Sequence, residues 1–168
     1  MQALEEAVRS GVFPGASAAV GWRGQRVLAQ SGRQEYDPTS SKITQQTIYD
    51  CASLTKPVAT TTMAMILLDR GLLSLDAPVS AYLPEFLEGD DPLADERRRV
   101  TVKHLLAHTS GLPAYAQFYQ RARRPEHVLD EALVLPLEHA PGERTVYSDV
   151  GFILLGELLV RIATRAAR

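Results

Sequence analysis

Apolar residues recur at helical spacing near the amino terminus and alternate with polar ones soon after. Leu4, Val8 and several alanines predict a short helix over residues 2–10, which Gly11 ends. The following segment, GVFPGASAAVGWRGQRVLAQSG, places two apolar runs on either side of Arg23-Gly24. This pattern predicts a β-hairpin with a glycine-assisted turn, followed by a polar connecting loop over residues 33–49.

The most apolar internal segment runs from Ser53 to Gly71 and is apolar nearly all round. A helix of this kind is normally buried, so we expect it at the centre of the fold. Residues 88–99 are acidic and then basic, with a proline, and predict an exposed loop. The run Arg97-Arg98-Arg99 is expected to be solvated there.

The carboxyl half is predicted to be helical. Thr101 is a good N-cap for VKHLLAH, a further helical stretch opens at Pro125, and SDVGFILLGELLVRIATRAAR is a capped apolar helix. The order is thus a helix, a hairpin and about five further helices, with no repeat and no linker between domains. A lone hairpin is marginally stable and has two open edges, so the sheet is expected to be unfinished.

Charge and cysteine content exclude several classes of protein. The 168 residues carry a formal net charge of −2, which creates no field that would attract nucleic acid or an anionic membrane. The amino terminus is acidic where a signal peptide would be basic, and no apolar run approaches the roughly 18 residues of a membrane span. We therefore expect a cytoplasmic chain. A single cysteine, Cys51, excludes intrachain disulfides and Cys-rich metal sites, and is expected to be a small packing residue.

The stretch CASLTKPV contains a serine and a lysine three positions apart, Ser53 and Lys56. On a helix such residues share a face, so their side chains can touch. A serine hydroxyl becomes a nucleophile when a neighbouring base takes its proton. By spacing alone, however, a capping serine followed by an exposed lysine explains the pair better than a catalytic role does.

The longer stretch CASLTKPVATTTMAMILLDRGLLSLDAPVSAYLP resembles the central helix of the penicillin-recognising serine hydrolases. This group holds class C β-lactamases, D-alanyl-D-alanine peptidases and related esterases. The likeness continues in VTVKHLLAHTSGLP at 100–113, in PGERTVYSDVGFILLGELL at 141–159, and upstream in the hairpin. It implies an α+β, β-lactamase/transpeptidase-like fold, of which residues 1–168 are a single partial domain. Residues 1–32 would be the helix and hairpin of the α/β part, and residues 33–168 the mainly helical part.

The resemblance also implies roles for particular residues. Ser53 would be the acylated nucleophile, Lys56 its proton acceptor, and Tyr147 the tyrosine of the family's Y-x-N element, which relays a proton to the leaving group. A phenol can do this when a cation such as Lys56 lowers its pKa. The implied substrate is a small-molecule ester, amide or β-lactam, and no metal or organic cofactor is implied. Many members of the family are exported.

Asp149 stands where the family usually has asparagine. An ionised aspartate beside Lys56 would favour the protonated amine and oppose its use as a base. It could instead hold Lys56 as a cation that polarises Tyr147. The alternative is that Asp149 caps the last helix, where a negative charge is favourable.

The family's third element, K-T-G or H-x-G on a late strand, has no match in the sequence. That element supplies one amide of the oxyanion hole, and loss of one donor typically lowers turnover about 100- to 1000-fold. We therefore expect a weak or inactive catalyst from this chain alone, with the remaining strands of the sheet also missing. The other hypothesis is a truncated or non-catalytic fragment that persists by association with a second copy or with a complementing carboxyl-terminal chain.

Two other groups of residues could carry chemistry but fit it poorly. His104 and His108 have the i, i+4 spacing that metals use, yet no glutamate accompanies them in the zinc-peptidase pattern, so core or capping roles are favoured. Ser110 lies near His108 without a G-x-S-x-G elbow around it. Ser110-Gly111 is better interpreted as a helix stop.

Overall fold

A computed structural model describes residues 2–121 and 124–167. The chain divides into two compact units, Met1–Asp50 and Cys51–Arg168. Each unit has its own elements and is described separately. The family resemblance implies a different boundary, between residues 32 and 33, which separates the α/β part of the fold from the mainly helical part. That boundary stays a prediction.

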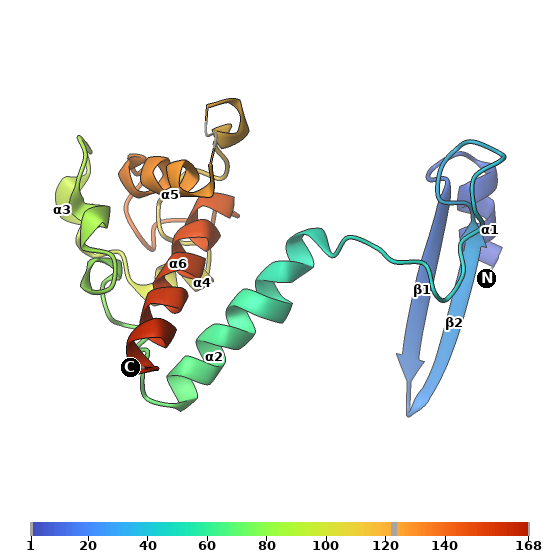
Figure 1. Ribbon diagram of the computed structural model, residues 1–168, viewed down its shortest axis with the longest axis horizontal. Coiled ribbons are helices and arrows are strands. Elements are labelled where there is room, and N and C mark those ends of the chain that lie inside the picture. Colours follow the sequence, from blue (N-terminus) through green and yellow to red (C-terminus); the bar gives the residue numbers. More distant parts are fainter. Residues whose placement is uncertain (1, 122–123, 168) are drawn as a thin grey trace. The chain divides into compact units, whose positions relative to one another are not determined.

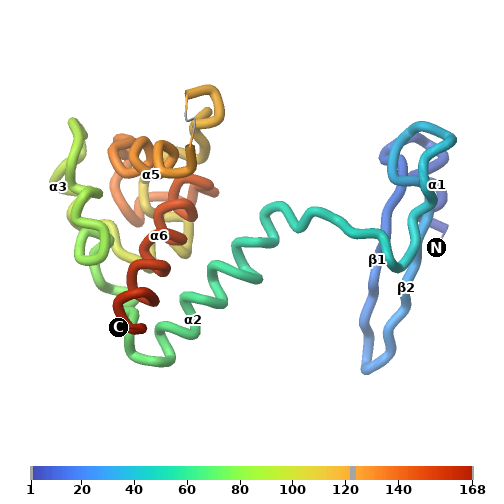
Figure 2. Tube along the Cα trace, in the orientation of Figure 1, coloured from blue at the N-terminus to red at the C-terminus, as the bar shows by residue number. Residues whose placement is uncertain are grey.

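The first unit contains the predicted helix and hairpin. Helix α1 (Gln2–Arg9) is followed by β1 (Gly15–Trp22) and β2 (Gln25–Gly32), which pair antiparallel. The strands are joined by Arg23 and Gly24, both with positive φ, as a two-residue turn matching the twist of the strands requires. Figure 2 traces this hairpin, with α1 packed on β2. The sheet within the described residues has these two strands, so the predicted hairpin is confirmed.

The second unit is helical and is built around one long helix, α6 (Asp149–Ala166). Its buried face includes Val150, Leu154 and Leu158, and α2, α4 and α5 all contact α6 (Figure 1). The other elements of this unit are η1 (Ala52–Leu54), the π-helical turn η2 (Lys56–Thr61), α2 (Thr62–Asp69), η3 (Val79–Ala81), η4 (Pro84–Leu87), α3 (Ala94–Arg97), α4 (Val102–Leu106), η5 (Phe118–Gln120) and α5 (Pro125–Val134). Among the described residues, no helix is both long and apolar enough to cross a membrane.

The apolar segment after Ser53 is only half buried, so its predicted position at the centre of the fold is wrong. Ala64 and Leu67 are buried, whereas Val58 is 71% exposed and Met65 63% exposed. Helix α2 contacts α6, and the buried pair belongs to the same hydrophobic core as the buried residues of α6. The apolar pattern on every side of this segment therefore predicted a helix, but it did not show which faces of the helix the second unit would cover.

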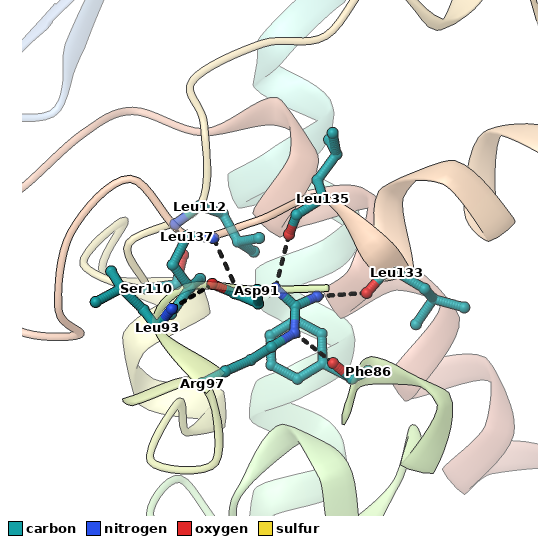
Figure 3. Close-up of polar contacts among 9 residues, drawn as sticks. All are labelled: Phe86, Asp91, Leu93, Arg97, Ser110, Leu112, Leu133, Leu135 and Leu137. Carbon is teal, nitrogen blue, oxygen red and sulfur yellow. Dashed lines mark hydrogen bonds and ion pairs between the residues drawn. The ribbon is translucent and has the colours of Figure 1, made fainter. Parts of the chain in front are cut away.

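The predicted exposed loop over residues 88–99 is also wrong at its most important point. Arg97 is 2% exposed and pairs with buried Asp91 at 2.8 Å. Its guanidinium also donates hydrogen bonds to the backbone carbonyls of Phe86, Leu133 and Leu135 (Figure 3). A buried guanidinium is tolerated here because four of its five N–H donors are directed at acceptors. Arg97 thereby joins the η4 segment to the end of α5, while Arg98 and Arg99 are exposed as expected.

Asp91 is held in its ionised form by its surroundings. Burial raises the pKa of its carboxyl, but the backbone N–H groups of Leu93 and Leu137 and the charge of Arg97 outweigh burial, so the pKa lies below its usual value. Asp91 and Arg97 together therefore fix three separate segments of the second unit.

Candidate active site

The backbone around Ser53 is irregular. Ala52, immediately before it, has a φ of 43°, an unusual conformation for a residue with a side chain. Ser53 then lies in the single turn η1, and the helix continues as the π-helical turn η2, with Pro57 near its start. Positive φ values and π-helical turns both occur often at functional sites. They leave the Ser53 side chain exposed at the amino-terminal end of the helix.

Ser53, Lys56 and Asp149 form a continuous chain of polar contacts. Lys56 Nζ lies 3.4 Å from Ser53 Oγ and 2.6 Å from Asp149 Oδ1. The Lys56 side chain is only 16% exposed, whereas that of Asp149 is 48% exposed. The expected i, i+3 contact is thus present, and α6 adds a carboxylate from 93 positions along the chain.

Tyr147 belongs to the same cluster. Lys56 Nζ lies 5.0 Å from the centroid of the Tyr147 ring, over its face. Hydrogen bonding to Ser53 and then to Lys56 lowers the pKa of the Tyr147 phenol below its usual value, and the charge of Lys56 acts in the same direction. The family resemblance implied that Ser53, Lys56 and Tyr147 would be neighbours and left open whether Asp149 would join them. The structure brings all four together.

Asp149 does not cap α6. The N-cap is Ser148, whose hydroxyl accepts a hydrogen bond from the Gly151 N–H at 2.9 Å and donates one to the Pro113 carbonyl at 2.6 Å. Asp149 is the first helical residue, and its carboxylate contacts Lys56 instead. The capping alternative for Asp149 is therefore wrong, because the serine one position earlier already satisfies the helix terminus.

The surroundings of Lys56 favour its protonated form. Burial alone would lower the pKa of the amine, but the hydrogen bonds to Asp149 and Tyr147 and the charge of Asp149 outweigh burial and raise it. A pKa above the usual value keeps Lys56 protonated at neutral pH. In this arrangement the amine has no free lone pair with which to accept the proton of Ser53.

The remaining candidate residues have other partners. His104 completes a capping box with Thr101, as Nδ1 accepts the Thr101 N–H at 3.1 Å. Ser110 is buried and its hydroxyl accepts the Leu112 N–H, in agreement with a turn residue. No group of three His, Cys, Asp or Glu side chains within residues 2–121 and 124–167 could hold a metal ion. Cys51 is exposed, so its expected packing role is wrong.

An apolar cavity of about 770 Å³ opens beside Asp149. Its wall is formed largely by aromatic and aliphatic side chains from the segment after α4, from α5 and from α6. The Arg124 side chain also lines it. The aromatic and aliphatic lining includes Tyr115, Phe118, Tyr119, Val128 and Ile153. Because Asp149 also contacts Lys56, this cavity adjoins the polar cluster. No periodic pattern of residues predicts this cavity, because its lining comes from three separate segments.

Comparison with known proteins identifies the family. A family model described as Beta-lactamase matches residues 1–168. The chain belongs to the β-lactamase family. The α+β fold and the likeness to penicillin-recognising serine hydrolases expected from the sequence are thereby confirmed.

Individual members of the β-lactamase family agree over most of this chain but extend well beyond it. The chain is 30% identical to the N-acetylmuramyl-L-alanine amidase of Bacillus subtilis (strain 168), across 96% of this chain and 40% of that protein. It is 31% identical to esterase EstB of Burkholderia gladioli, across 94% of this chain and 43% of that protein. A class C beta-lactamase solved in complex with cefoxitin superposes with a TM-score of 0.79 and 26% identity, across 96% of this chain and 43% of the other. The chain thus spans less than half the length of these relatives.

Proposed function

We propose that this chain carries the nucleophile side of a serine hydrolase active site, in which Ser53 forms an acyl-enzyme with an ester, amide or lactam carbonyl. The observation that supports this most strongly is the convergence of Ser53, Lys56, Tyr147 and Asp149. The first two lie at the start of one helix and the last two at the start of another, far apart in sequence. A hydroxyl, a phenol, a cation and a carboxylate in mutual contact are the components of an activated nucleophile.

In the proposed acylation step, Tyr147 rather than Lys56 accepts the proton of Ser53. Ser53 Oγ forms a bond to the carbonyl carbon as its proton passes to the phenolate oxygen of Tyr147. Asp149 keeps Lys56 protonated, and the resulting cation stabilises the phenolate. The role of proton acceptor that the family resemblance gave to Lys56 is therefore moved to Tyr147, and Lys56 becomes its electrostatic partner.

In the second half of the proposed cycle, the same proton leaves Tyr147. The phenol donates it to the oxygen or nitrogen of the leaving group as the carbonyl–leaving-group bond breaks. A water molecule then attacks the acyl-Ser53 carbonyl carbon and gives a proton to Tyr147. As the bond between the acyl carbon and Ser53 Oγ breaks, Tyr147 donates that proton to Oγ, which releases the acid and restores both the Ser53 hydroxyl and the phenolate.

The cavity beside Asp149 is the proposed place for a substituent of the substrate. Its largely apolar lining favours an apolar group over a charged one, and a small-molecule substrate of the family's ester, amide or β-lactam type would fit its volume. A backbone amide at Ser53 is the one oxyanion donor proposed from this chain. We therefore expect residues 1–168 alone to acylate slowly and to turn over weakly or not at all.

A fluorophosphonate probe tests the proposed nucleophile because it needs one attack and no turnover. We expect the probe to label the chain at Ser53, as identified by peptide mass spectrometry, and Ser53→Ala to abolish labelling. The matched control, Ser74→Ala, removes an exposed serine of the same unit and should label like the parent chain. Labelling that persists in Ser53→Ala would refute the assignment.

A second function, association with another polypeptide, is favoured by the uncovered side of η2 and α2. Val58, Met65, Ile66 and Leu68 are all exposed there, and large exposed apolar patches mark interaction surfaces. We propose that a second copy or a complementing carboxyl-terminal chain binds this side. Light scattering should then give a mass above that of the monomer, and Met65→Lys should return it to the monomer, whereas Asp69→Lys on the same helix should not. A stable monomer of the parent chain would count against association with a second copy, and failure to bind an added carboxyl-terminal polypeptide from a related enzyme would count against complementation.

A further inference from the structure

We propose that His108 is a positioning residue for Tyr147, holding the phenol at Ser53 when its imidazole is neutral and releasing it when the imidazole is protonated. This inference rests on the proposed function, because it assigns a device that controls the proposed proton acceptor. The sequence singled out His108 only as a poor metal ligand.

The contacts of His108 enclose Tyr147 from both sides along the chain. The backbone carbonyl of His108 accepts the Val146 N–H at 2.8 Å, and its ring Nδ1 accepts the Ser148 N–H at 3.0 Å. The residues immediately before and after Tyr147 are thus both hydrogen-bonded to one histidine.

The imidazole ring also packs on the phenol itself. Its centroid lies 4.5 Å from that of Tyr147 and 4.8 Å from that of Phe152, so the ring packs against two aromatic side chains. His108 adopts a φ of 57°, a left-handed conformation that costs free energy in a residue with a side chain. In this backbone conformation the imidazole ring of His108 packs against the rings of Tyr147 and Phe152.

The hydrogen bond from Ser148 requires neutral His108. A ring nitrogen accepts a hydrogen bond only when it carries no proton, so the neutral tautomer has its proton on Nε2. Two charged groups face this ring: Lys56 from η2 and Asp149 from α6. Burial and then Lys56 lower the pKa of His108, while Asp149 opposes them, so the neutral ring is favoured at neutral pH.

Protonation would remove the hydrogen bond that the ring accepts from the Ser148 N–H, while the backbone bond from the Val146 N–H to the His108 carbonyl would stay. Nδ1 would become a donor facing the Ser148 N–H donor, and a second cation would be placed beside Lys56. The ring would then no longer hold the backbone on the Ser148 side of Tyr147. We therefore expect Tyr147 to lose its position, and Ser53 its proton acceptor, as the pH falls through the lowered pKa of His108.

Two substitutions separate the hydrogen bond from ring packing. His108→Asn offers an amide oxygen near the position of Nδ1, tolerates positive φ and does not titrate. His108→Phe keeps an aromatic ring but provides no acceptor for the Ser148 N–H. Thermal unfolding identifies a variant that fails to fold, and His108→Asn remains informative if His108→Phe does not fold.

Two measurements test the positioning role without any catalysis. Hydrogen exchange at the Ser148 amide should be slow in the parent and in His108→Asn, and fast in His108→Phe. The phenol of Tyr147, followed by NMR, should titrate at a lowered pKa in the parent and return toward the ordinary value in His108→Phe. A merely structural histidine would leave the Tyr147 titration unchanged in a folded variant, and that result would overturn the inference.

A third measurement connects positioning to chemistry. The rate of fluorophosphonate labelling at Ser53 should fall about 10- to 100-fold in His108→Phe, as expected for a displaced catalytic group. The parent should also lose rate as the pH falls through the lowered pKa of His108, in addition to the loss caused by protonation of the Tyr147 phenolate, and His108→Asn should remove only the part that follows His108. If Ser53 is labelled and the three pH profiles coincide, the positioning role fails while the proposed function stands. If the parent is not labelled at Ser53, the proposed function fails, and the amide exchange and phenol titration still decide whether His108 holds Tyr147.

Discussion

Replacement of Arg97 by methionine tests the buried contacts that hold the second unit together. Methionine is apolar, flexible and of comparable length, so Arg97→Met fills much of the space while removing every donor of the guanidinium. It leaves three backbone carbonyls without this partner and Asp91 without its countercharge.

The expected loss of stability follows from the number of interrupted contacts. A buried acceptor left unsatisfied costs about 1–3 kcal/mol, so the three carbonyls alone cost about 3 kcal/mol at the low end of that range. Breaking a buried ion pair by removing one partner costs about 3–5 kcal/mol. Asp91 keeps its hydrogen bonds from Leu93 and Leu137, which limits the penalty for its unpaired charge. We expect the free energy of unfolding to fall by about 3–5 kcal/mol, which for a unit of this size lowers Tm by roughly 12–20 °C.

Thermal unfolding followed by far-ultraviolet circular dichroism measures this loss, because most helices belong to the second unit. The matched control is Arg98→Met, which changes an exposed arginine of the same run and should shift Tm by no more than about 2 °C. A Tm for Arg97→Met within that margin would refute the conclusion that the guanidinium is buried and bonded.

The dependence on pH gives an independent test of the same pair. The folded pKa of Asp91 lies below its unfolded value, so its contribution to stability is present above the unfolded value, about 3.9, and is lost as the pH falls through the folded value. Arg97→Met removes one cause of the lowered pKa. The variant should therefore lose less additional stability than the parent between pH 4 and more acid conditions; an equal loss would contradict an Asp91–Arg97 interaction.

Two further predictions concern the start of α6. Asp149→Asn should lower the pKa of Lys56, because the carboxylate is one cause of its raised value. Labelling of Ser53 depends on the Lys56 cation, so on the alkaline side of the pH profile it should decline at a lower pH in the variant than in the parent. An unchanged profile would contradict the electrostatic role of Asp149. Ser148→Ala should destabilise the second unit by about 1–2 kcal/mol in urea unfolding, because the Gly151 N–H loses its acceptor and the Pro113 carbonyl loses its donor. A change within experimental error would show that the cap contributes little.

Local sequence signals were sufficient for the elements and for part of the candidate site. The hairpin around Arg23-Gly24, helix α5 from Pro125 and helix α6 all follow from periodicity and from cap or turn residues, which act over a few positions. The Ser53–Lys56 contact is of the same kind, since three positions along a helical turn place two side chains together. Only the family resemblance suggested that Tyr147 and Asp149 would join them.

Tertiary structure alone decided the environments of the charged and polar groups. Arg97 and Arg98 are identical neighbours in the sequence, yet only Arg97 finds carbonyl acceptors and a carboxylate from distant segments, so only Arg97 is buried. The sequence alone allows Asp149 either to cap a helix or to pair with Lys56. In the structure Ser148 caps α6, and Asp149 pairs with Lys56. The sequence by itself therefore determined the hairpin and the longer helices, because those preferences are local, whereas the short helix α3 lies in the segment predicted to be a loop. The protonation of Lys56 and the surroundings of His108 depend on groups that only folding brings within a few ångströms.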